Sequence, residues 1–379
     1  MENETKTLKY LFVDDNSGRR QSIQNFLIEG KLDIVDVNPP QSLRDVFKLL
    51  IGYDGLIVDQ QLDEQSPDDD SPIEYLGSSL AMEIRVKENE SILKGTDISM
   101  PIILYSANEN VGSNLFGLGE EIFDFKIYKS NSEPYQEFRS KIPIYQKQMI
   151  SLVNGYKQLK ELKSNVFDCL GLGEENLGKI DGRFLDELKR RKDRTAHSKA
   201  SFILNELIIK QGILIDEEIL AVRLGIDKRE SKDNWIAVLA DLKEFGAEYQ
   251  GVFCDGWPRW WMPMVDDWWY QLEGNETYIR FYSAEKRSKL IEGKLNEKLP
   301  EKIQLVPSKA KSKFSVHTDF WTICDETKEP LDIEDGLMRP NQENLYPWQD
   351  ASYVSIQAAK DGAEVAECEK ERLKMIKGI

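Results

Sequence analysis

The sequence has few of the side chains that build metal knots and no segment long enough to cross a membrane. Only two histidines and four cysteines occur among 379 residues, and no two cysteines form a C-x-x-C pair. This spacing argues against a zinc site and favours reduced thiols over a disulfide framework. No apolar run approaches the ~18 residues of a membrane span. The polar start, residues 1–6, does not resemble a secretory signal, so we expect a cytoplasmic protein.

Positive charge is also scarce. The chain carries 50 Lys and Arg against 67 Asp and Glu, which gives a net charge of −17. This balance opposes bulk attraction to nucleic acid or to anionic lipid. A local basic stretch, Arg183–Lys199, is interpreted as a solvated helix surface. We expect no contact with a membrane. Binding of nucleic acid remains an alternative only through residues 183–242.

The first third of the chain alternates apolar runs with amphipathic stretches. The expected strands are Leu8–Val13, Leu32–Val37, Asp54–Val58, Pro101–Tyr105 and Phe125–Tyr128. The expected helices are Asn16–Glu29, Leu43–Ile51, one through Leu80 and Ile84, a poorly defined one near residues 108–121, and a long one over 134–162. Such alternation predicts an α/β domain with a five-stranded, doubly wound parallel sheet.

The pattern changes after about residue 165. Residues 183–246 are expected to be mainly helical, residues 250–283 are rich in tryptophan, and residues 351–379 have the pattern of one charged amphipathic helix. We expect a first domain over 1–145, a helical linker over 146–180, and a mainly α or α+β C-terminal region over 181–379. The tryptophans are interpreted as core or as a protein interface, because aromatic side chains bury large areas.

Polar side chains follow four of the expected strands. Asp14 and Asp15 follow the first strand, Asp59 the third, Ser106 the fourth and Lys129 the fifth. The carboxyl ends of parallel strands line one crevice. Crowded carboxylates favour a divalent cation, and Mg²⁺ prefers oxygen ligands. A carboxylate there can attack a phosphoryl group, whose oxygens a hydroxyl and an ammonium can then bind.

These residues lie in four motifs: LFVDDN (11–16), LIVDQQL (56–62), PIILYSA (101–107) and IYKS (127–130). Over roughly residues 6–145 the chain resembles the flavodoxin-like receiver domain of bacterial two-component response regulators.

The resemblance implies a role for each matching residue. Asp59 would be the phosphoacceptor, Asp14 and Asp15 the acid pair, and Gln61 a metal ligand through its backbone carbonyl. Ser106 would be the switch hydroxyl and Lys129 the phosphate-pairing lysine. The implied cofactor is Mg²⁺, and the implied phosphoryl donor is a histidine kinase or a phosphotransfer protein.

Three departures from the family pattern stand out. Asp63 and Ser130 replace prolines that are common in the family, and no aromatic residue lies three positions before Lys129. Lys126 competes with Lys129 for the lysine role. The loop after Asp59 is strongly acidic, which suits a solvated insertion.

Other motifs carry weaker signals. The segment GEENLGKI (173–180) lacks the hydroxyl of a phosphate-binding loop. Residues 217–242 have the outline of two helices around Gly225, as in helix-turn-helix modules, but the second helix is mostly apolar. His197 and His317 are interpreted as ordinary surface histidines.

We interpret the chain as a signalling protein that accepts a phosphoryl group on Asp59 and acts through a protein-binding C-terminal region. The alternatives are a phosphorylation-controlled DNA-binding regulator and a phosphate sink or relay. We recognise no separate catalytic domain, so the receiver would catalyse only its own phosphorylation and dephosphorylation. A homodimer through the face that contains strand five is a further expectation.

Overall fold

A computed structural model describes residues 7–15, 32–37, 39, 42–62, 73, 75–106, 122–128, 135–162, 165–274, 277–309, 320–342 and 344–378. The chain forms two compact units, which we describe separately. The first unit comprises Met1–Leu172, Asp186–Leu204 and Gly251–Trp257. The second unit comprises Gly173–Leu185, Asn205–Gln250 and Pro258–Ile379.

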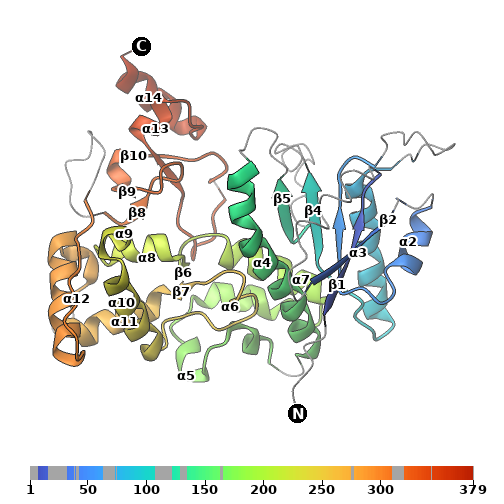
Figure 1. Ribbon diagram of the computed structural model, residues 1–379, viewed down its shortest axis with the longest axis horizontal. Coiled ribbons are helices and arrows are strands. Elements are labelled where there is room, and N and C mark those ends of the chain that lie inside the picture. Colours follow the sequence, from blue (N-terminus) through green and yellow to red (C-terminus); the bar gives the residue numbers. More distant parts are fainter. Residues whose placement is uncertain are drawn as a thin grey trace. The chain divides into compact units, whose positions relative to one another are not determined.

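A five-stranded parallel sheet forms the centre of the first unit (Figure 1). Its strands are β1 (Leu8–Val13), β2 (Leu32–Val37), β3 (Gly55–Val58), β4 (Ile102–Ser106) and β5 (Phe125–Tyr128). They lie in the order β2-β1-β3-β4-β5, with parallel pairing throughout. This order is that of flavodoxin-like doubly wound sheets and places a topological switch point between β1 and β3. The expected sheet is therefore confirmed.

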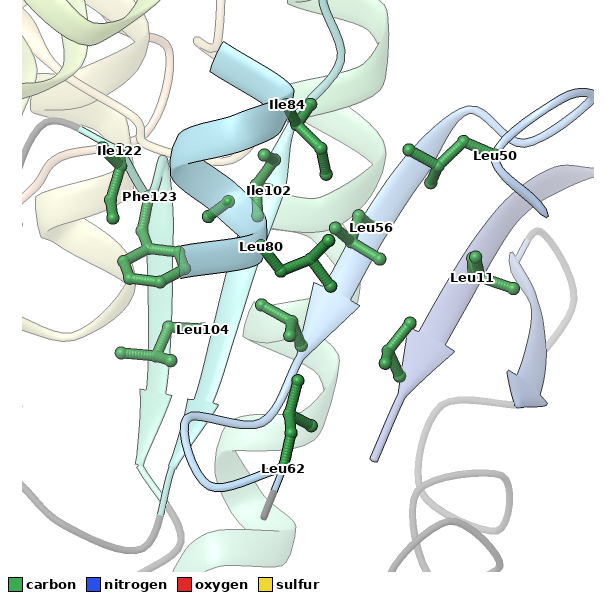
Figure 2. Close-up of a cluster of buried hydrophobic side chains, with 13 residues drawn as sticks. Leu11, Leu50, Leu56, Leu62, Leu80, Ile84, Ile102, Leu104, Ile122 and Phe123 are labelled. Carbon is green, nitrogen blue, oxygen red and sulfur yellow. The ribbon is translucent and has the colours of Figure 1, made fainter. Parts of the chain in front are cut away.

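Helices α2 (Leu43–Leu49) and α3 (Gly77–Leu93) cover one face of the sheet. Because side chains alternate along a strand, every second strand residue points to this face. Figure 2 shows α3 placing Leu80 and Ile84 against Leu56, Ile102 and other strand residues of this face. Because helices cover both faces of the sheet, its strands are apolar on both faces.

Helix α4 (Tyr135–Glu161) covers the opposite face. The buried Tyr10 of β1 donates a hydrogen bond of 2.8 Å from its hydroxyl to the Met149 carbonyl oxygen of α4. Lys157 of α4 forms an ion pair of 2.8 Å with Asp54, just before β3. The long helix expected over 134–162 is confirmed. The helices expected at Asn16–Glu29 and near residues 108–121 lie outside the described residues.

Two later parts of the chain complete the first unit. One contains α7 (Ala196–Ile203), whose N-terminal Ala196 amide donates to Asp97 in the loop before β4, at 2.7 Å. The other is 251–257, where the Val252 amide donates to the carbonyl oxygen of Cys169 at 2.8 Å. Cys169 belongs to a short 3₁₀ helix, η3 (Val166–Leu170).

The second unit is mostly helical with small sheets. Its helices are α5 (Glu174–Leu177), α8 (Glu217–Arg223), α9 (Lys228–Ser231), α10 (Asp233–Phe245), α11 (Met262–Glu273), α12 (Ala284–Lys298), α13 (Ile356–Lys360) and α14 (Lys370–Lys377), and α6 (Gly182–Lys189) spans the unit boundary. Two-stranded antiparallel sheets pair β6 (Leu214–Ile215) with β7 (Trp260–Trp261), β8 (Thr322–Ile323) with β9 (Pro330–Leu331), and β10 (Gly336–Met338) with β11 (Tyr353–Ser355). None of the described helices is long and apolar enough to cross a membrane.

The tryptophans of residues 250–283 are core residues, as expected. All five, Trp257, Trp260, Trp261, Trp268 and Trp269, are buried. Trp257 lies in the first unit and the other four in the second. Each indole ring buries a large apolar area in its unit.

The single helix expected over residues 351–379 is wrong. The segment begins with strand β11, continues through the five-residue α13, and ends in α14. Ser355 caps α13, accepting a hydrogen bond from the Ala358 amide. Gly362, with φ of +115°, lies in the turn that follows α13. A cap and a glycine turn this close together leave room for only one short helix between them.

Candidate functional site

The ends of β1 and β3 bring Asp14 and Asp59 together. Val13 and Val58 are partners in the register of these two strands, so the aspartate that follows each one lies just beyond the sheet. The Asp59 amide donates to the Val13 carbonyl oxygen at 3.0 Å and thereby extends the pairing by one step. The switch point of the sheet is where ligands bind in doubly wound folds.

Asp14, Asp15 and Asp59 form a buried cluster. Each offers a carboxylate oxygen, and these atoms lie within 4.8 Å of one another. Two unit charges at about 4 Å repel by about 4 kcal/mol in surroundings with an effective dielectric constant of roughly 20. A divalent cation removes this repulsion, and three hard carboxylate ligands suit Mg²⁺, which keeps its other positions for water or phosphate oxygens. The chemistry of these donors thus fits the predicted metal.

The first residues of α3 pack against Asp59 and Gln60. The Gly77 amide donates to the Gln60 carbonyl oxygen at 2.9 Å, and the Gln60 side chain donates to the Ser78 hydroxyl at 3.1 Å. A Cβ atom on Gly77 would lie 2.0 Å from the Asp59 carbonyl oxygen. Only glycine allows α3 to approach the residue that follows β3 this closely. Gly77 was not among the predicted site residues, although a glycine where a helix begins beside a candidate site strand was a usable signal.

The other predicted site residues have different outcomes. Ser106 is buried at the end of β4, and its register partner is Tyr128, the last residue of β5. Lys129 follows Tyr128 in the sequence but lies outside the described residues. Lys126 is half-buried within β5, three residues before that position. Gln61 directly follows Gln60, its side chain is exposed, and its backbone role stays a prediction.

A buried ionic network lies at the other end of β5 and was not foreseen. Asp124, just before β5, accepts a hydrogen bond of 2.7 Å from Arg85 of α3 and one of 2.5 Å from the Tyr156 hydroxyl of α4. Arg85 also pairs with Glu88 at 2.8 Å. The oxygen of Tyr156 lies 2.9 Å from Nδ1 of His197 in α7. The network joins helices from both faces of the sheet and the later segment 186–204.

The network shifts the acidity of its members. Burial acts to raise the pKa of Asp124, but the Arg85 guanidinium, together with His197 and the Tyr156 hydroxyl, outweighs it and holds that pKa below its ordinary value. Burial and the Asp124 charge raise the pKa of Tyr156 well above its ordinary value. Asp124 is therefore a carboxylate and Tyr156 a neutral donor at neutral pH.

The expectation of an exposed His197 is wrong. Its side chain is only 13% exposed, because the ring packs into the network beside Tyr156 and Asp124. The sequence gives no periodic signal for this contact, since its partners lie 41 and 73 positions earlier in the chain. His317 lies outside the described residues.

The basic stretch is engaged by acidic neighbours. Arg190 and Arg191 both form ion pairs with Glu187, and Arg183 pairs with Asp181. Most of the stretch is a solvated surface, as expected, but Lys199 is buried and donates from Nζ to the Arg194 carbonyl oxygen.

The segment 217–242 consists of packed helices. Lys228 forms ion pairs with Glu217 and Glu218, and the buried Arg223 pairs with Asp350. Trp235 of α10 is also buried, which agrees with helical packing rather than a DNA-reading helix.

The glycine-rich segment 173–180 forms no phosphate cradle. Gly173 precedes α5, a helix of four residues, and a Cβ on this glycine would lie 2.3 Å from a carboxylate oxygen of Glu175. A carboxylate held at this position would repel a phosphate group.

Comparison with known proteins finds similarity in solved structures only. No family model and no curated protein matches the chain. The response regulator protein TrrA from Thermotoga maritima, solved in complex with Mg²⁺-BeF, is 22% identical, with 36% of this chain and 97% of that chain covered and a TM-score of 0.25. The response regulator domain of Thermotoga maritima CheB is 15% identical, with 39% and 98% covered and a TM-score of 0.27.

A CheY-like receiver domain from Methylobacillus flagellatus is 21% identical, with 37% of this chain and 98% of that chain covered and a TM-score of 0.25. These likenesses fall on the N-terminal third of the chain, which holds the five-stranded parallel sheet. The N-terminal third is thus similar to response-regulator receiver domains.

Proposed function

We propose that residues 1–145 act as a receiver in which Asp59 accepts a phosphoryl group from a histidine kinase or a phosphotransfer protein. The observation that carries this proposal is the buried cluster of Asp14, Asp15 and Asp59 at the switch point of a parallel sheet. Burying three carboxylates together costs stability unless a cation is bound, so such a cluster favours a functional role.

Asp14, Asp15 and Asp59 would hold Mg²⁺ through their carboxylate oxygens, and Gln61 would add its backbone carbonyl. The bound ion would neutralise the negative charge that otherwise keeps an anionic phosphoryl group away from three carboxylates. Side chains of the protein would supply the nucleophile and the other contacts to the phosphoryl oxygens.

In the proposed reaction a carboxylate oxygen of Asp59 attacks the phosphorus atom of a phosphohistidine. A P–O bond to Asp59 forms as the P–N bond breaks, and the imidazole leaves and takes up a proton. Ser106 would donate its hydroxyl hydrogen to one phosphoryl oxygen, and Lys129 would pair with another. Attack of water on the aspartyl phosphate would later release inorganic phosphate and restore Asp59.

The C-terminal region, residues 181–379, would carry the output to a protein partner. Several basic residues of segment 183–242 are buried or form ion pairs with acidic neighbours. Such residues are poorly placed to neutralise the phosphates of a nucleic acid, which favours a protein partner over DNA.

Beryllofluoride binding tests the proposal, because this anion mimics a phosphoryl group on a carboxylate. Calorimetry should show that wild-type protein binds it only when Mg²⁺ is present, and that Asp59→Asn abolishes binding. Asp45→Asn is the matched control, since Asp45 forms an exposed pair with Lys48 on α2. Equal binding by wild type and Asp59→Asn, or none by folded wild type, would refute the proposed acceptor.

A further inference from the structure

Helices α10, α11 and α12 of the second unit pack together (Figure 1), and a cavity of about 630 Å³ lies among them. This volume is in the range of sites that bind small organic molecules. Phe245, Trp268 and Leu272 supply the apolar part of the lining, and the other lining side chains are charged or polar. The lining therefore suits a molecule that has both an apolar body and a polar or charged group.

Two hydrogen bonds connect the three helices beside the cavity. Asp241 of α10 accepts a hydrogen bond of 2.6 Å from Nε1 of Trp268 in α11. Its other carboxylate oxygen accepts one of 3.2 Å from Nζ of Lys298 in α12. Each helix contributes one of these side chains, so the wall is formed by the protein alone. Asp241 and Lys298 also neutralise each other, which leaves the remaining lining charges to decide what the cavity binds.

The remaining charges make the cavity negative. The lining contains three carboxylates and two ammonium groups. Lys294 forms only a loose pair of 3.8 Å with Glu297, and the Glu244 carboxylate has no ion pair or hydrogen bond with any residue that the structure describes. The lining residues also lie in the last two turns of their helices, where the helix dipole adds partial negative charge. Three helix ends and an excess carboxylate together favour a positively charged ligand.

The lining favours an organic cation over a metal ion. Among the residues with described positions, only Asp14, Asp15 and Asp59 bring three ligand groups close enough together to hold a metal ion. The carboxylates of the cavity are therefore not arranged as metal ligands. Aromatic rings attract ammonium and guanidinium groups, and the apolar lining stabilises an apolar body attached to such a group.

We infer that this cavity binds an organic cation that carries an ammonium group on an apolar chain. In this assignment the ammonium group pairs with Glu244, and the apolar chain packs against Phe245 and Leu272. The site adds binding of a small molecule to the C-terminal region. It does not depend on phosphoryl transfer to Asp59, so the inference and the proposed function stand or fall separately.

Calorimetry of the full-length protein with three probes of similar shape tests the inference. Phenylbutylamine carries an ammonium group, phenylbutanol a neutral hydroxyl and phenylbutyrate a carboxylate on nearly the same apolar body. The amine should bind at least about tenfold more tightly than the alcohol, as expected for one charge-assisted hydrogen bond, and the acid should bind most weakly. An amine that binds no more tightly than the alcohol, or that does not bind, overturns the inference.

Variants separate the cavity from the general attraction of an acidic protein for cations. Glu244→Gln should weaken amine binding about tenfold or more, because it removes the carboxylate that pairs with the ammonium group. Glu230→Gln is the matched control, since Glu230 is exposed on α9 and does not line the cavity.

A third variant has an effect of opposite sign. Lys294→Gln removes a positive charge from the lining and should tighten amine binding roughly twofold to fivefold, a gain that damage to the fold does not produce. Equal affinities of Glu244→Gln and Glu230→Gln, or no gain in Lys294→Gln, contradict the assigned site.

Discussion

Single residues set the geometry of the buried aspartate cluster. Asp59 is positioned through its backbone, which donates to Val13 on one side and faces the first residue of α3, Gly77, on the other. The carboxylates give the site its negative charge. The absence of a side chain at Gly77 allows α3 to begin close to the Asp59 backbone. The carboxylates could be predicted from the sequence because of their residue type and their place after the strands. The need for a glycine at position 77 depends on a close approach between two elements that is seen only in the structure.

Replacing Gly77 with alanine should therefore impair the site. The added Cβ would lie 2.0 Å from the Asp59 carbonyl oxygen, so β3 or α3 must move. We expect Mg²⁺-dependent beryllofluoride binding to weaken by about tenfold or more, since a displacement near 1 Å is enough to cost that much. Gly182→Ala is the control: Gly182 is the first residue of α6, and a Cβ there meets nothing within 4 Å. Calorimetry of both variants decides, and equal loss in both would argue against the close approach.

Asp124 is the residue on which the buried network depends. Asp124→Asn leaves the Arg85 guanidinium buried without its full complement of charge, which should lower the free energy of unfolding by about 3 kcal/mol. Asp45→Asn, in the exposed pair with Lys48, should cost less than about 1 kcal/mol. Denaturant titration measures both.

The pH dependence of this loss follows from the lowered pKa of Asp124. A carboxyl whose pKa is lower in the folded state stabilises the fold above its unfolded pKa, and this stability disappears as the pH falls through the folded value. The difference between wild type and Asp124→Asn should thus be full at pH 7 and shrink on acidification below about pH 4. A difference that stays constant down to pH 2 would mean that the Asp124 charge is not its source.

At the scale of elements, α3 combines structure and function. It begins against Asp59, buries Leu80 and Ile84 in the core of the sheet, and contributes Arg85 to the ionic network. One helix therefore connects the end of the sheet that holds Asp59 with the opposite end.

Core packing should dominate the stability contributed by α3. Leu80→Ala is expected to cost about 2–5 kcal/mol, because Leu80 is fully buried (Figure 2) and its loss leaves a cavity. Val86→Ala on the same helix should change stability by less than about 0.5 kcal/mol, since Val86 is exposed. Thermal and chemical unfolding of the two variants checks this, and similar costs at both positions would contradict the assigned face.

Elements of the N-terminal third were predictable because their signals are local. Strands such as β1 and β4 are continuous apolar runs between polar turns, and α4 has apolar positions at helical spacing. In the C-terminal third, short elements such as α13 and β11 fall below the length at which periodicity is informative. A charged stretch with two short helices therefore had the pattern of one long helix.

At the scale of the whole molecule, the chain divides into two units that are not continuous in sequence. Segments 186–204 and 251–257 return to the N-terminal third, and the contacts that hold them join residues such as Phe125 and Trp257. Pairings over more than a hundred positions leave no periodic pattern in one sequence. The boundaries predicted at 145 and 180 follow changes in composition along the chain. The return of α7 and of residues 251–257 to the first unit depends on packing, which composition does not reveal.

The second unit should show its own pH dependence through Asp266. Burial, with a smaller contribution from Asp267, raises the pKa of this carboxyl to about 7, although Arg223 opposes the shift. The folded state then binds more protons than the unfolded state between the ordinary pKa and about pH 7, so stability falls as the pH rises through this window. Asp266→Asn should raise the free energy of unfolding at pH 8 by at least about 1 kcal/mol and have little effect near pH 4. Equal effects at both pH values would contradict the raised pKa.

The most direct test of the central claim is transfer of a phosphoryl group to Asp59. Full-length protein is incubated with Mg²⁺ and phosphoramidate, a donor with the P–N bond of phosphohistidine, and the modified residue is located by peptide mass spectrometry. We predict a hydroxylamine-sensitive phosphoryl group on Asp59 that requires Mg²⁺ and is absent from Asp59→Asn but present in Asp45→Asn. A folded wild-type protein that stays unmodified, or a modification that persists in Asp59→Asn, would contradict the account.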